Sequence, residues 1–284
     1  MDISLARTFL EVVRSGSLIA ASEQLHVTQA AVTARIQSLE SQLNCRLFVR
    51  NRGGARLTRD GELFVTYANQ LVQTWEAAQR DLPLISGIDS VLHLGCETSL
   101  YNPLMLHWVR LLRAEQGSQA VHTEVGEGAA LQRRLEQGTL DAALVFQPSY
   151  WPGLQVEELL EEKLIQVCLP SQPEPYIYID WGEAFRQQHD RALPDKAKAE
   201  LTFNLGPMAL QYLLSCGGSG YFRTRVVQSY LDSGQLQRVP RAPEFSFPAW
   251  LVYPRERDSE ALQQAIALLR RAAADSHDWS QRWG

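Results

Sequence analysis

Arginines gather in one short stretch of a chain that is acidic as a whole, with a net charge of −5 over 284 residues. Between Gln29 and Arg59, six arginines face a single acid, Glu40. Because a guanidinium group binds phosphate oxygens through paired hydrogen bonds, this basic patch favours contact with the DNA backbone. Exposed arginines are also common on solvated surfaces. The helices and strands that carry these arginines therefore determine which of the two interpretations is favoured. The six are Arg35, Arg46, Arg50, Arg52, Arg56 and Arg59.

The rest of the sequence shows no catalytic or metal-binding pattern. Phosphate-binding glycine loops, the nucleophile motif G-x-S-x-G and the zinc motif H-E-x-x-H are absent, and the six histidines lack ligand spacing. The sequence has neither a signal peptide nor a run of about 18 apolar residues. We therefore expect a cytoplasmic protein that is not an enzyme and uses no cofactor or metal. The cysteines lie far apart and indicate reduced thiols: Cys45, Cys96, Cys168 and Cys216.

The basic patch needs a scaffold, and the first sixty residues predict three helices. Apolar residues recur at helical spacing from about 5 to 13, and Ser17 is a good cap for a second helix. The turn His26-Val27 separates that helix from a third, which Thr28 would cap and which runs from about Gln29 to Leu43. A short helix, a tight turn and a helix whose first residues reach base edges form a helix-turn-helix.

The next residues, 46–58, predict a two-stranded hairpin. Two short apolar runs at 47–49 and 55–57 flank the polar tip Asn51-Arg52-Gly53-Gly54. Such a wing would lie over the DNA backbone or the minor groove. A three-helix cluster with a hairpin can be purely structural. Here, however, the arginines are concentrated in the two elements that geometry would place against phosphates.

Together these residues resemble the DNA-binding domain of the LysR-type transcriptional regulators. The matching positions are Phe9-Leu10, Ala20-Ala21, Leu25, Thr28-Gln29, Ala31-Val32, Ile36, Leu39-Glu40, Leu43, Leu47-Phe48, Arg50, Leu57-Thr58 and Gly61. The sequence departs from the family pattern at Ala30, Thr33 and Asn44. The resemblance implies that residues of the third helix contact bases or nearby phosphates and that the wing holds the backbone. The implied residues are Thr28, Gln29, Thr33 and Arg35 in the first group and Arg50, Arg52 and Arg56 in the second.

A long helical pattern follows, from Thr58 to about Leu82, where Pro83 ends it. Its apolar positions are spaced 4, 3, 4, 3, 4, like the seam of a coiled coil, so we expect pairing with a second copy of the chain. The alternative is that these residues pack on their own domain. The resemblance favours pairing, because linker helices of this family dimerise and commonly build tetramers. The seam consists of Phe64, Ala68, Leu71, Trp75, Ala78 and Leu82.

Beyond a linker at 83–90, strand and helix patterns alternate, which predicts an α/β domain. A first run has strands at 91–96, 121–125 and 142–146 and helices at 103–114 and 129–137. A second run has strands at 164–169, 201–205, 220–222 and 236–239 and helices at 181–189, 208–215 and up to 231. A strand at 249–253 and a helix at 259–274 close the domain.

Two α/β lobes with two crossings between them resemble the periplasmic-binding-protein-like effector domain of the same family. The matching segments are Gly138 to Leu144 and the crossover Glu161 to Leu164. The segment Gly217 to Tyr221 resembles the family's glycine turn but lacks its usual downstream proline. The expected fold is an all-α winged helix-turn-helix domain at 1–59, a linker and dimerisation helix at 60–89, and an effector-binding domain at 90–284. Lobe I would cover 90–163 and 245–284, and lobe II 164–244.

In open α/β sheets, ligands bind beyond the carboxyl ends of strands, where helix N-termini offer free amides to an anion. Polar side chains at such positions also serve as plain helix caps, and aromatic ones as plain core. An anionic effector is expected if Arg223 or Arg225, near the glycine turn, joins the site. The candidate effector residues are Thr98, Ser99, Gln147, Asn204, Phe222 and Phe247.

The sequence as a whole predicts an oligomeric regulator whose grip on promoter DNA changes when a small-molecule effector closes the cleft between the lobes. RNA polymerase is expected as a further partner. The alternative is a constitutive repressor or an architectural DNA-binding protein whose cleft is vestigial. The segment Asp180-Trp181-Gly182 is unusual, and its sequence suggests no mechanism.

Overall fold

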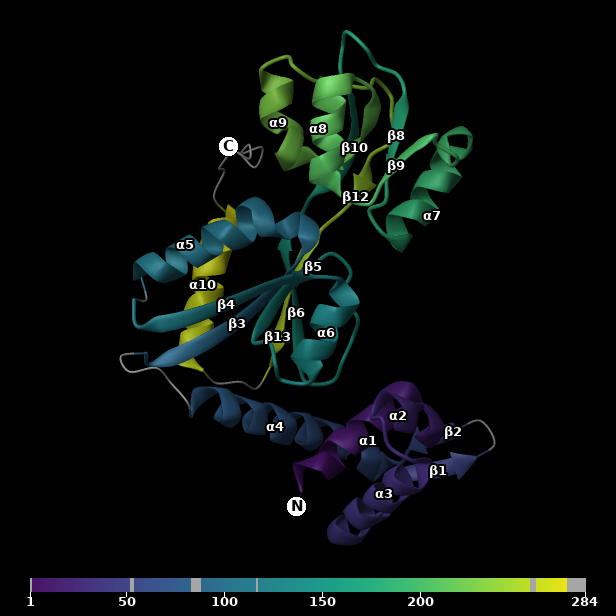
Figure 1. Ribbon diagram of the computed structural model, residues 1–284, viewed down its shortest axis with the longest axis vertical. Helices are drawn as coiled ribbons and strands as arrows, with labels where there is room; N and C mark the ends of the chain where they lie inside the picture. Colours follow the sequence, from purple (N-terminus) through teal and green to yellow (C-terminus); the bar gives the residue numbers. More distant parts are fainter. Residues whose placement is uncertain (1, 52–53, 83–87, 116, 256–258, 275–284) are drawn as a thin grey trace.

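The computed structural model describes residues 2–51, 54–82, 88–115, 117–255 and 259–274, and Figure 1 shows a small helical domain followed by two α/β lobes. A long helix, α4, leads from the first domain toward the lobes. The first domain contains α1 (Ile3–Ser15), α2 (Leu18–Gln24), α3 (Gln29–Leu43), the hairpin strands β1 (Phe48–Asn51) and β2 (Gly54–Leu57), and α4 (Arg59–Asp81).

Each helix of this domain begins at a side chain that accepts a backbone N–H of the first turn, as helix caps do. At the other end, Gly16 and Asn44 take left-handed backbone at φ 70° and 53°, which ends α1 and α3. The predicted helix-turn-helix and wing are confirmed, and α3 spans the expected residues. The capping residues are Asp2, Ser17, Thr28 and Thr58.

Phe9 of α1 lies at the centre of this domain. Its ring centroid is 5.2 Å from that of Phe48 in the wing and 5.0 Å from that of Phe64 in α4. Phe64 and Ala68 are therefore buried in the core of their own domain. The expectation that these two residues begin a pairing seam is wrong, because the first half of α4 serves as the fourth helix of the DNA-binding domain.

The exposed apolar face of α4 is offset by one residue from the expected seam in this first half. It runs through Leu63 and Tyr67, both 61% exposed, and then joins the expected seam at Leu71. From there the two coincide through Trp75, which is 47% exposed, to Leu82. The whole face consists of Leu63, Tyr67, Leu71, Trp75, Ala78 and Leu82.

Lobe I is a five-stranded sheet in the order β4-β3-β5-β13-β6. Helices α5 and α10 cover one face and α6 the other (Figure 1). Its strands are β3 (Ser90–Glu97), β4 (Gln119–Gly126), β5 (Ala142–Val145), β6 (Leu154–Leu160) and β13 (Ala249–Pro254). Its helices are α5 (Leu106–Glu115), α6 (Gly128–Glu136) and α10 (Glu260–Ala274), and two short turns, η1 (Thr98–Leu100) and η2 (Tyr101–Met105), precede α5.

Lobe II is built on a second sheet in the order β11-β7-β10-β8-β9, with β12 also paired to β7. Because β12 belongs here, lobe II extends two residues beyond the expected boundary at 244. The strands are β7 (Lys163–Cys168), β8 (Tyr176–Ile179), β9 (Leu201–Phe203), β10 (Ser219–Arg223), β11 (Gln237–Arg238) and β12 (Phe245–Ser246). The helices are α7 (Glu183–Ala192), α8 (Gly206–Cys216) and α9 (Thr224–Asp232), with a short turn η3 (Pro194–Lys196).

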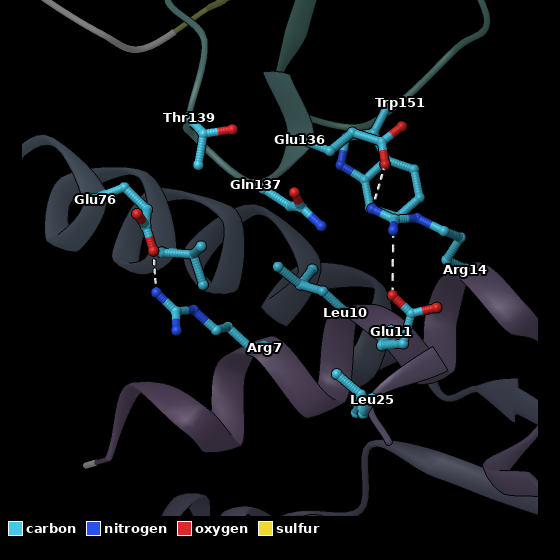
Figure 2. A pocket seen from close by; sticks show the side chains of 11 residues that line it. Arg7, Leu10, Glu11, Arg14, Leu25, Glu76, Glu136, Gln137, Thr139 and Trp151 are labelled. Atoms are coloured by element: carbon cyan, nitrogen blue, oxygen red, sulfur yellow. Dashed lines mark hydrogen bonds and ion pairs between the residues drawn. The ribbon is translucent and has the colours of Figure 1, made fainter. Parts of the chain in front are cut away.

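The first domain rests on lobe I of the same chain (Figure 2). Residues of α1 and α4 contact the end of α6 and the loop between β5 and β6. Trp151, in that loop, packs against the cores of both units. The position of the helix-turn-helix relative to the lobes is therefore set by direct side-chain contacts as well as by the linker.

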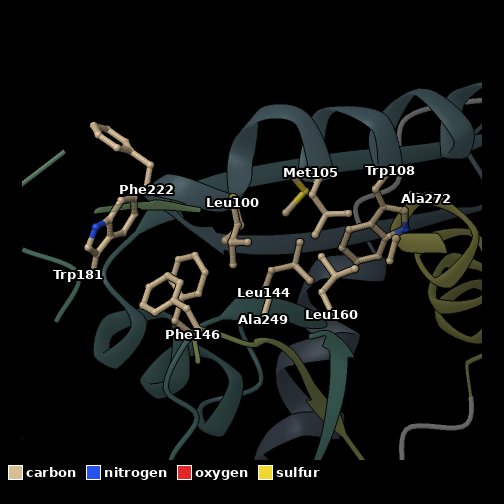
Figure 3. Close-up of a cluster of buried hydrophobic side chains, with 14 of the residues drawn as sticks. Leu100, Met105, Trp108, Leu144, Phe146, Leu160, Trp181, Phe222, Ala249 and Ala272 are labelled. Carbon is tan, nitrogen blue, oxygen red and sulfur yellow. The ribbon is translucent and has the colours of Figure 1, made fainter. Parts of the chain in front are cut away.

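The larger apolar core runs through both lobes (Figure 3), and a smaller one lies between α6 and the sheet of lobe I. Trp108, fully buried in lobe I, donates its indole N–H to the carbonyl of Ala265 on α10 at 2.7 Å. At the other end of the core, Trp181 and Phe222 belong to lobe II. The chain crosses between the lobes twice, and the crossings are joined where the Phe247 N–H donates to the Glu162 carbonyl at 2.7 Å.

None of the helices within the described residues is long and apolar enough to cross a membrane. The same part of the chain contains no group of three or more histidine, cysteine or acidic side chains placed to hold a metal ion.

Candidate DNA-binding surface and inter-lobe cleft

Helix α3 exposes its N-terminal end while its apolar stripe packs into the domain core. Thr28 and Gln29 are exposed there, and Thr33 is half-buried. Arg35, further along the helix, is also half-buried and donates from Nη1 to Oγ1 of Thr8 on α1 at 3.3 Å. The first turn of α3 is therefore accessible to a ligand, whereas Arg35 bridges two helices at the margin of that surface.

The wing is seated on the turn between α1 and α2. The Ala55 N–H donates to the Gly16 carbonyl at 2.9 Å. A Cβ on Gly54, whose φ is 118°, would lie 2.5 Å from that same oxygen, so the position requires glycine. Arg56 is exposed on β2, and Arg50 lies opposite Ala55 on β1. Arg52, the third predicted wing arginine, lies outside the described residues.

Glu40, the one acid of the basic stretch, is buried and ties α3 to the wing. Its Oε1 accepts the backbone N–H groups of Leu47 at 2.8 Å and Phe48 at 3.3 Å, and its Oε2 accepts Nη1 of Arg46 at 3.0 Å. The Arg46 side chain is 79% exposed, so its charge is only partly engaged in this pair. The sequence placed Glu40 only in a family pattern, although its isolation among arginines was a signal that it has a fixed partner.

The polar effector candidates lie where the sequence placed them, at the carboxyl ends of strands. Thr98 and Ser99 form the turn after β3, Gln147 follows β5, and Asn204 follows β9 in lobe II. A Cβ on Gly182 of lobe II would lie 3.5 Å from the Gln147 amide nitrogen, so Gln147 faces the other lobe. All of these side chains are exposed except that of Ser99, which is half-buried.

The two aromatic candidates are buried instead of open to a cleft. Phe222 is 1% exposed and Phe247 is 5% exposed. The Phe247 ring lies 4.2 Å from that of Phe146 and 5.4 Å from that of Trp181. In this arrangement both phenylalanines belong to the core at the crossing between the lobes (Figure 3 labels Phe146, Trp181 and Phe222), the plain alternative that the sequence left open.

Arg223 joins the lobes and is engaged by protein groups. It is 2% exposed, it donates from Nε to Glu162 at 2.9 Å, and its guanidinium lies 5.5 Å over the Phe146 ring. It also donates to the Ser99 carbonyl of lobe I. Arg225 likewise donates to a lobe I carbonyl, that of Ala273, at 3.3 Å. These contacts do not support the expectation that either arginine holds an anionic effector.

Glu97, which the sequence left unassigned, lies at the N-terminus of α6. Its Oε1 accepts the Phe146 N–H at 2.9 Å, and a Cβ on Gly128, the first residue of α6, would lie 2.6 Å from that oxygen. Burial raises the pKa of Glu97. A protein carboxylate therefore occupies the place where a helix N-terminus would hold an anion.

Trp181 covers the corresponding end of α8 in lobe II. A Cβ on Gly206, the first residue of α8, would lie 3.0 Å from Cζ2 of the indole and closer still to Cη2. The indole N–H donates to the Tyr221 carbonyl at 2.9 Å. The unusual Asp180-Trp181-Gly182 segment thus closes a helix end with a ring that fits only against glycine.

Comparisons with known proteins agree along nearly the whole chain. Residues 3–62 match the family model "Bacterial regulatory helix-turn-helix protein, lysR family", and residues 86–274 match "LysR substrate binding domain". The HTH-type transcriptional regulator HdfR of Yersinia pestis (strain Pestoides F) is 30% identical over 278 residues, covering 92% of this chain and 94% of the relative.

Two solved structures share the fold. Full-length LysG from Corynebacterium glutamicum with bound effector Arg has a TM-score of 0.59 at 17% identity, covering 96% of this chain and 98% of that one. DarR from Vibrio fischeri in complex with DNA has a TM-score of 0.56 at 17% identity, covering 96% and 99%.

A winged helix-turn-helix joined by a long helix to a two-lobed α/β domain defines a DNA-binding transcriptional regulator with a separate effector-binding domain. This chain belongs to the LysR family of bacterial transcriptional regulators.

Proposed function

We propose that the first turn of α3 enters the major groove of promoter DNA and that Gln29 reads base edges there, with Thr28, Thr33 and Arg35 beside it. The observation that carries this proposal is the exposed position of Gln29 at the N-terminal end of α3. A glutamine amide donates and accepts at once, which suits the paired groups of adenine in the major groove. The wing arginines Arg50, Arg52 and Arg56 bind phosphates on either side.

The test is footprinting of the purified protein on its own upstream intergenic DNA, at several salt concentrations, with Gln29→Ala beside the wild type. The substitution should weaken binding at the specific site by about 1 to 3 kcal/mol and leave binding to random DNA nearly unchanged. Arg56→Ala is the matched control for a phosphate contact, because it should weaken binding to both DNAs and reduce the salt dependence. Equal losses for Gln29→Ala on both DNAs would contradict base reading.

The protein binds this DNA as a homo-oligomer paired through the exposed apolar face of α4. Six apolar side chains on one face of a helix that joins two domains are better accounted for by a second copy than by solvent. A dimer places two copies of α3 on related half-sites.

An effector binds between the lobes at Thr98, Ser99, Gln147 and Asn204. The position of Gln147, facing lobe II, supports this assignment, as does the bound effector in the related LysG structure. The effector shifts the protein between DNA-binding states only as far as it prefers one of them. A thermal-shift screen of metabolites should give hits that Gln147→Ala weakens. A screen and footprint that no metabolite changes would favour the constitutive regulator instead.

RNA polymerase is the further partner at the promoter, and the protein acts in the cytoplasm without catalysing a reaction. The pairing of buried Arg223 with Glu162 supports a structural role for both residues at the crossing between the lobes. Incubation of the purified protein with its thermal-shift hits should leave each of them chemically unchanged.

A further inference from the structure

The end of α1 is joined to the end of α6 across the boundary between the DNA-binding domain and lobe I. Arg14, one residue before the end of α1, pairs with Glu136, the last residue of α6, and with Glu11 of its own helix at 3.1 Å (Figure 2). The Arg14 guanidinium also lies 5.5 Å over the ring of Trp151. Glu136 is 7% exposed, so its charge depends on this pairing.

A second set of contacts holds α4 to the same loop. The Trp151 indole N–H donates to Oδ1 of Asn69 at 3.1 Å, and Nδ2 of Asn69 donates to the Pro152 carbonyl at 3.1 Å. Asn69 is 2% exposed, so these hydrogen bonds are formed away from solvent. A Cβ on Gly138 would lie 2.8 Å from the Cα of Gln73, which shows how closely the two backbones approach. Together we name Arg14, Asn69, Glu136 and Trp151 the interdomain joint.

The contact between the two units is not continuously packed. A cavity of about 290 Å³ lies within it, between the ion pair of Arg7 with Glu76 on one side and that of Arg14 with Glu136 on the other (Figure 2). Interdomain contacts that contain charged pairs beside a cavity let domains move relative to one another more readily than continuous apolar packing does.

Two segments lead from the joint to the inter-lobe cleft. Helix α6 has Gly128 against Glu97 at the cleft end and Glu136 against Arg14 at the other. The loop after β5 runs in parallel, from Gln147, which faces lobe II, to Trp151 in the joint.

The helix and the loop are locked together midway. The Oε1 of Gln132 on α6 accepts the N–H of Ser149 at 2.9 Å and its hydroxyl at 2.7 Å. Its amide donates to the Ser149 carbonyl at 2.9 Å. A displacement at the cleft end of the loop therefore moves α6 and the loop as one body, and both end on the DNA-binding domain.

We propose that the interdomain joint is the regulatory contact of this protein: it fixes the DNA-binding domain, and α3 with it, against lobe I and passes lobe movements to that domain. The proposal rests on the proposed function, because it takes operator DNA as the readout. The joint leaves the first turn of α3 exposed, so it governs the relative placement of two recognition helices in an oligomer and leaves the grip of one helix on one half-site unchanged.

The test compares Glu136→Gln and Trp151→Ala with the wild type. Glu157→Gln is the matched control, because it breaks a bidentate pair with Arg270 on lobe I, at 2.8 and 2.7 Å, that is remote from the joint. Hydrogen exchange around residues 69–73 and 147–153 first reports whether the joint has opened. We expect faster exchange there in both joint variants, binding to a single half-site within about twofold of wild type, and at least about fivefold weaker binding to the full operator.

A tethered form keeps the inference testable if either variant folds poorly. Gln73→Cys with Gly138→Cys would place two Cβ atoms about 3.3 Å apart, slightly under disulfide spacing, in a chain whose exposed Cys216 is replaced by serine. Because Gly138 has a φ of 72° and its added Cβ would lie 2.8 Å from the Cα of Gln73, the bond requires a small local backbone shift, so mass spectrometry and circular dichroism first check that the pair is oxidised and the chain folded. The oxidised protein should bind the full operator as the wild type does and should no longer change its footprint with any hit from the thermal-shift screen, while the reduced protein should respond.

Three results would overturn the inference. One is a joint variant with fast exchange at 69–73 whose affinity for the full operator equals that of Glu157→Gln, because the joint would then be passive. Another is an oxidised double-cysteine variant whose footprint still changes with a metabolite from the thermal-shift screen. Failure of the wild type to bind its upstream DNA at all would instead overturn the proposed function, and this inference with it.

Discussion

At the scale of single residues, Glu40 connects α3 to the wing through one carboxylate. Its carboxylate accepts two backbone N–H groups and an arginine while only 7% exposed, so it fixes the chain between α3 and the wing. Glu40→Ala leaves buried donors without an acceptor and should lower the free energy of unfolding by about 1 to 3 kcal/mol. Urea unfolding of the full chain measures this loss.

Arg46→Ala is the control for that prediction, because it removes the exposed partner and leaves the buried hydrogen bonds in place. It should cost under about 1 kcal/mol. A loss as large as that of Glu40→Ala would mean that the ion pair, and not the buried backbone contacts, holds the wing.

Glu97 gives a dependence on pH. Burial raises its pKa, so the folded protein keeps this proton to higher pH than the unfolded chain does. The protonated Glu97 side chain therefore favours the folded state at pH values below its pKa in the unfolded chain. This contribution to the free energy of unfolding is lost as pH rises through its pKa in the folded protein. Glu97→Gln should therefore gain stability relative to wild type as pH rises from about 4 to 7, measured by urea unfolding at several pH values. Parallel curves for the two proteins would contradict this.

Residue types predicted the exposed side chains of the DNA-binding surface well. They predicted less well which side chains at the cleft are available to an effector. Gln29 and Arg56 are exposed as the patterns indicated. Arg223, by contrast, is held by Glu162, a residue 61 positions away in sequence. A basic residue near a glycine turn looks the same whether its partner is a ligand or a distant glutamate, so pairing of this kind lies beyond sequence patterns.

At the scale of elements, the start of α4 depends on the absence of one side chain. A Cβ on Gly61 would lie 2.9 Å from Cδ2 of Leu57 and closer still to the Leu47 carbonyl oxygen. Gly61→Ala should cost about 2 kcal/mol or more, although alanine is the better helix former. Thermal unfolding measures the effect, and Gly117→Ala, with nothing within 4 Å of its added Cβ, should change stability by less than about 0.5 kcal/mol. Equal effects would exclude the steric reason.

Long periodic elements were predictable and short ones were not. The patterns found α3 and α10 almost to the residue, because each has a full apolar stripe and clear ends. They missed β6, an edge strand that carries two glutamates, and β8, only four residues long between prolines and a polar turn. They also began α5 three residues early, where η2 kinks at Asn102.

At the scale of the whole molecule, the exposed apolar face of α4 leads to a prediction about the molecular mass of the protein in solution. Trp75→Glu places a charge in the middle of that face and should shift the protein toward monomer at about 10 µM, because an unpaired charge is not tolerated in a buried seam. Light scattering after size exclusion reads the mass directly. Gln37→Glu, exposed on α3 and away from that face, is the matched control that adds the same charge and should leave the mass unchanged. A wild type that is already monomeric would remove the proposed pairing.

The order of domains and the presence of two lobes followed from the alternation of strand and helix patterns. The contact between the DNA-binding domain and lobe I did not, because Arg14 and Glu136 are 122 residues apart and each looks like an ordinary helix-end charge. The predicted seam on α4 included Phe64 and Ala68, which are buried in their own domain, for a related reason. The spacing of apolar residues alone cannot distinguish a helix face that packs on the core of its own domain from one that binds a second chain.

Strands β6 and β13 are direct neighbours in the first sheet, with Ala249 opposite Leu160, yet 88 residues separate them in the chain. All of lobe II is thus an insertion into what would otherwise be a hairpin. A chain in which a short turn replaced 163–246 would keep every strand of lobe I in sheet order and would keep the residues of the interdomain joint, while the part of the shared apolar core that lobe II covers would be exposed.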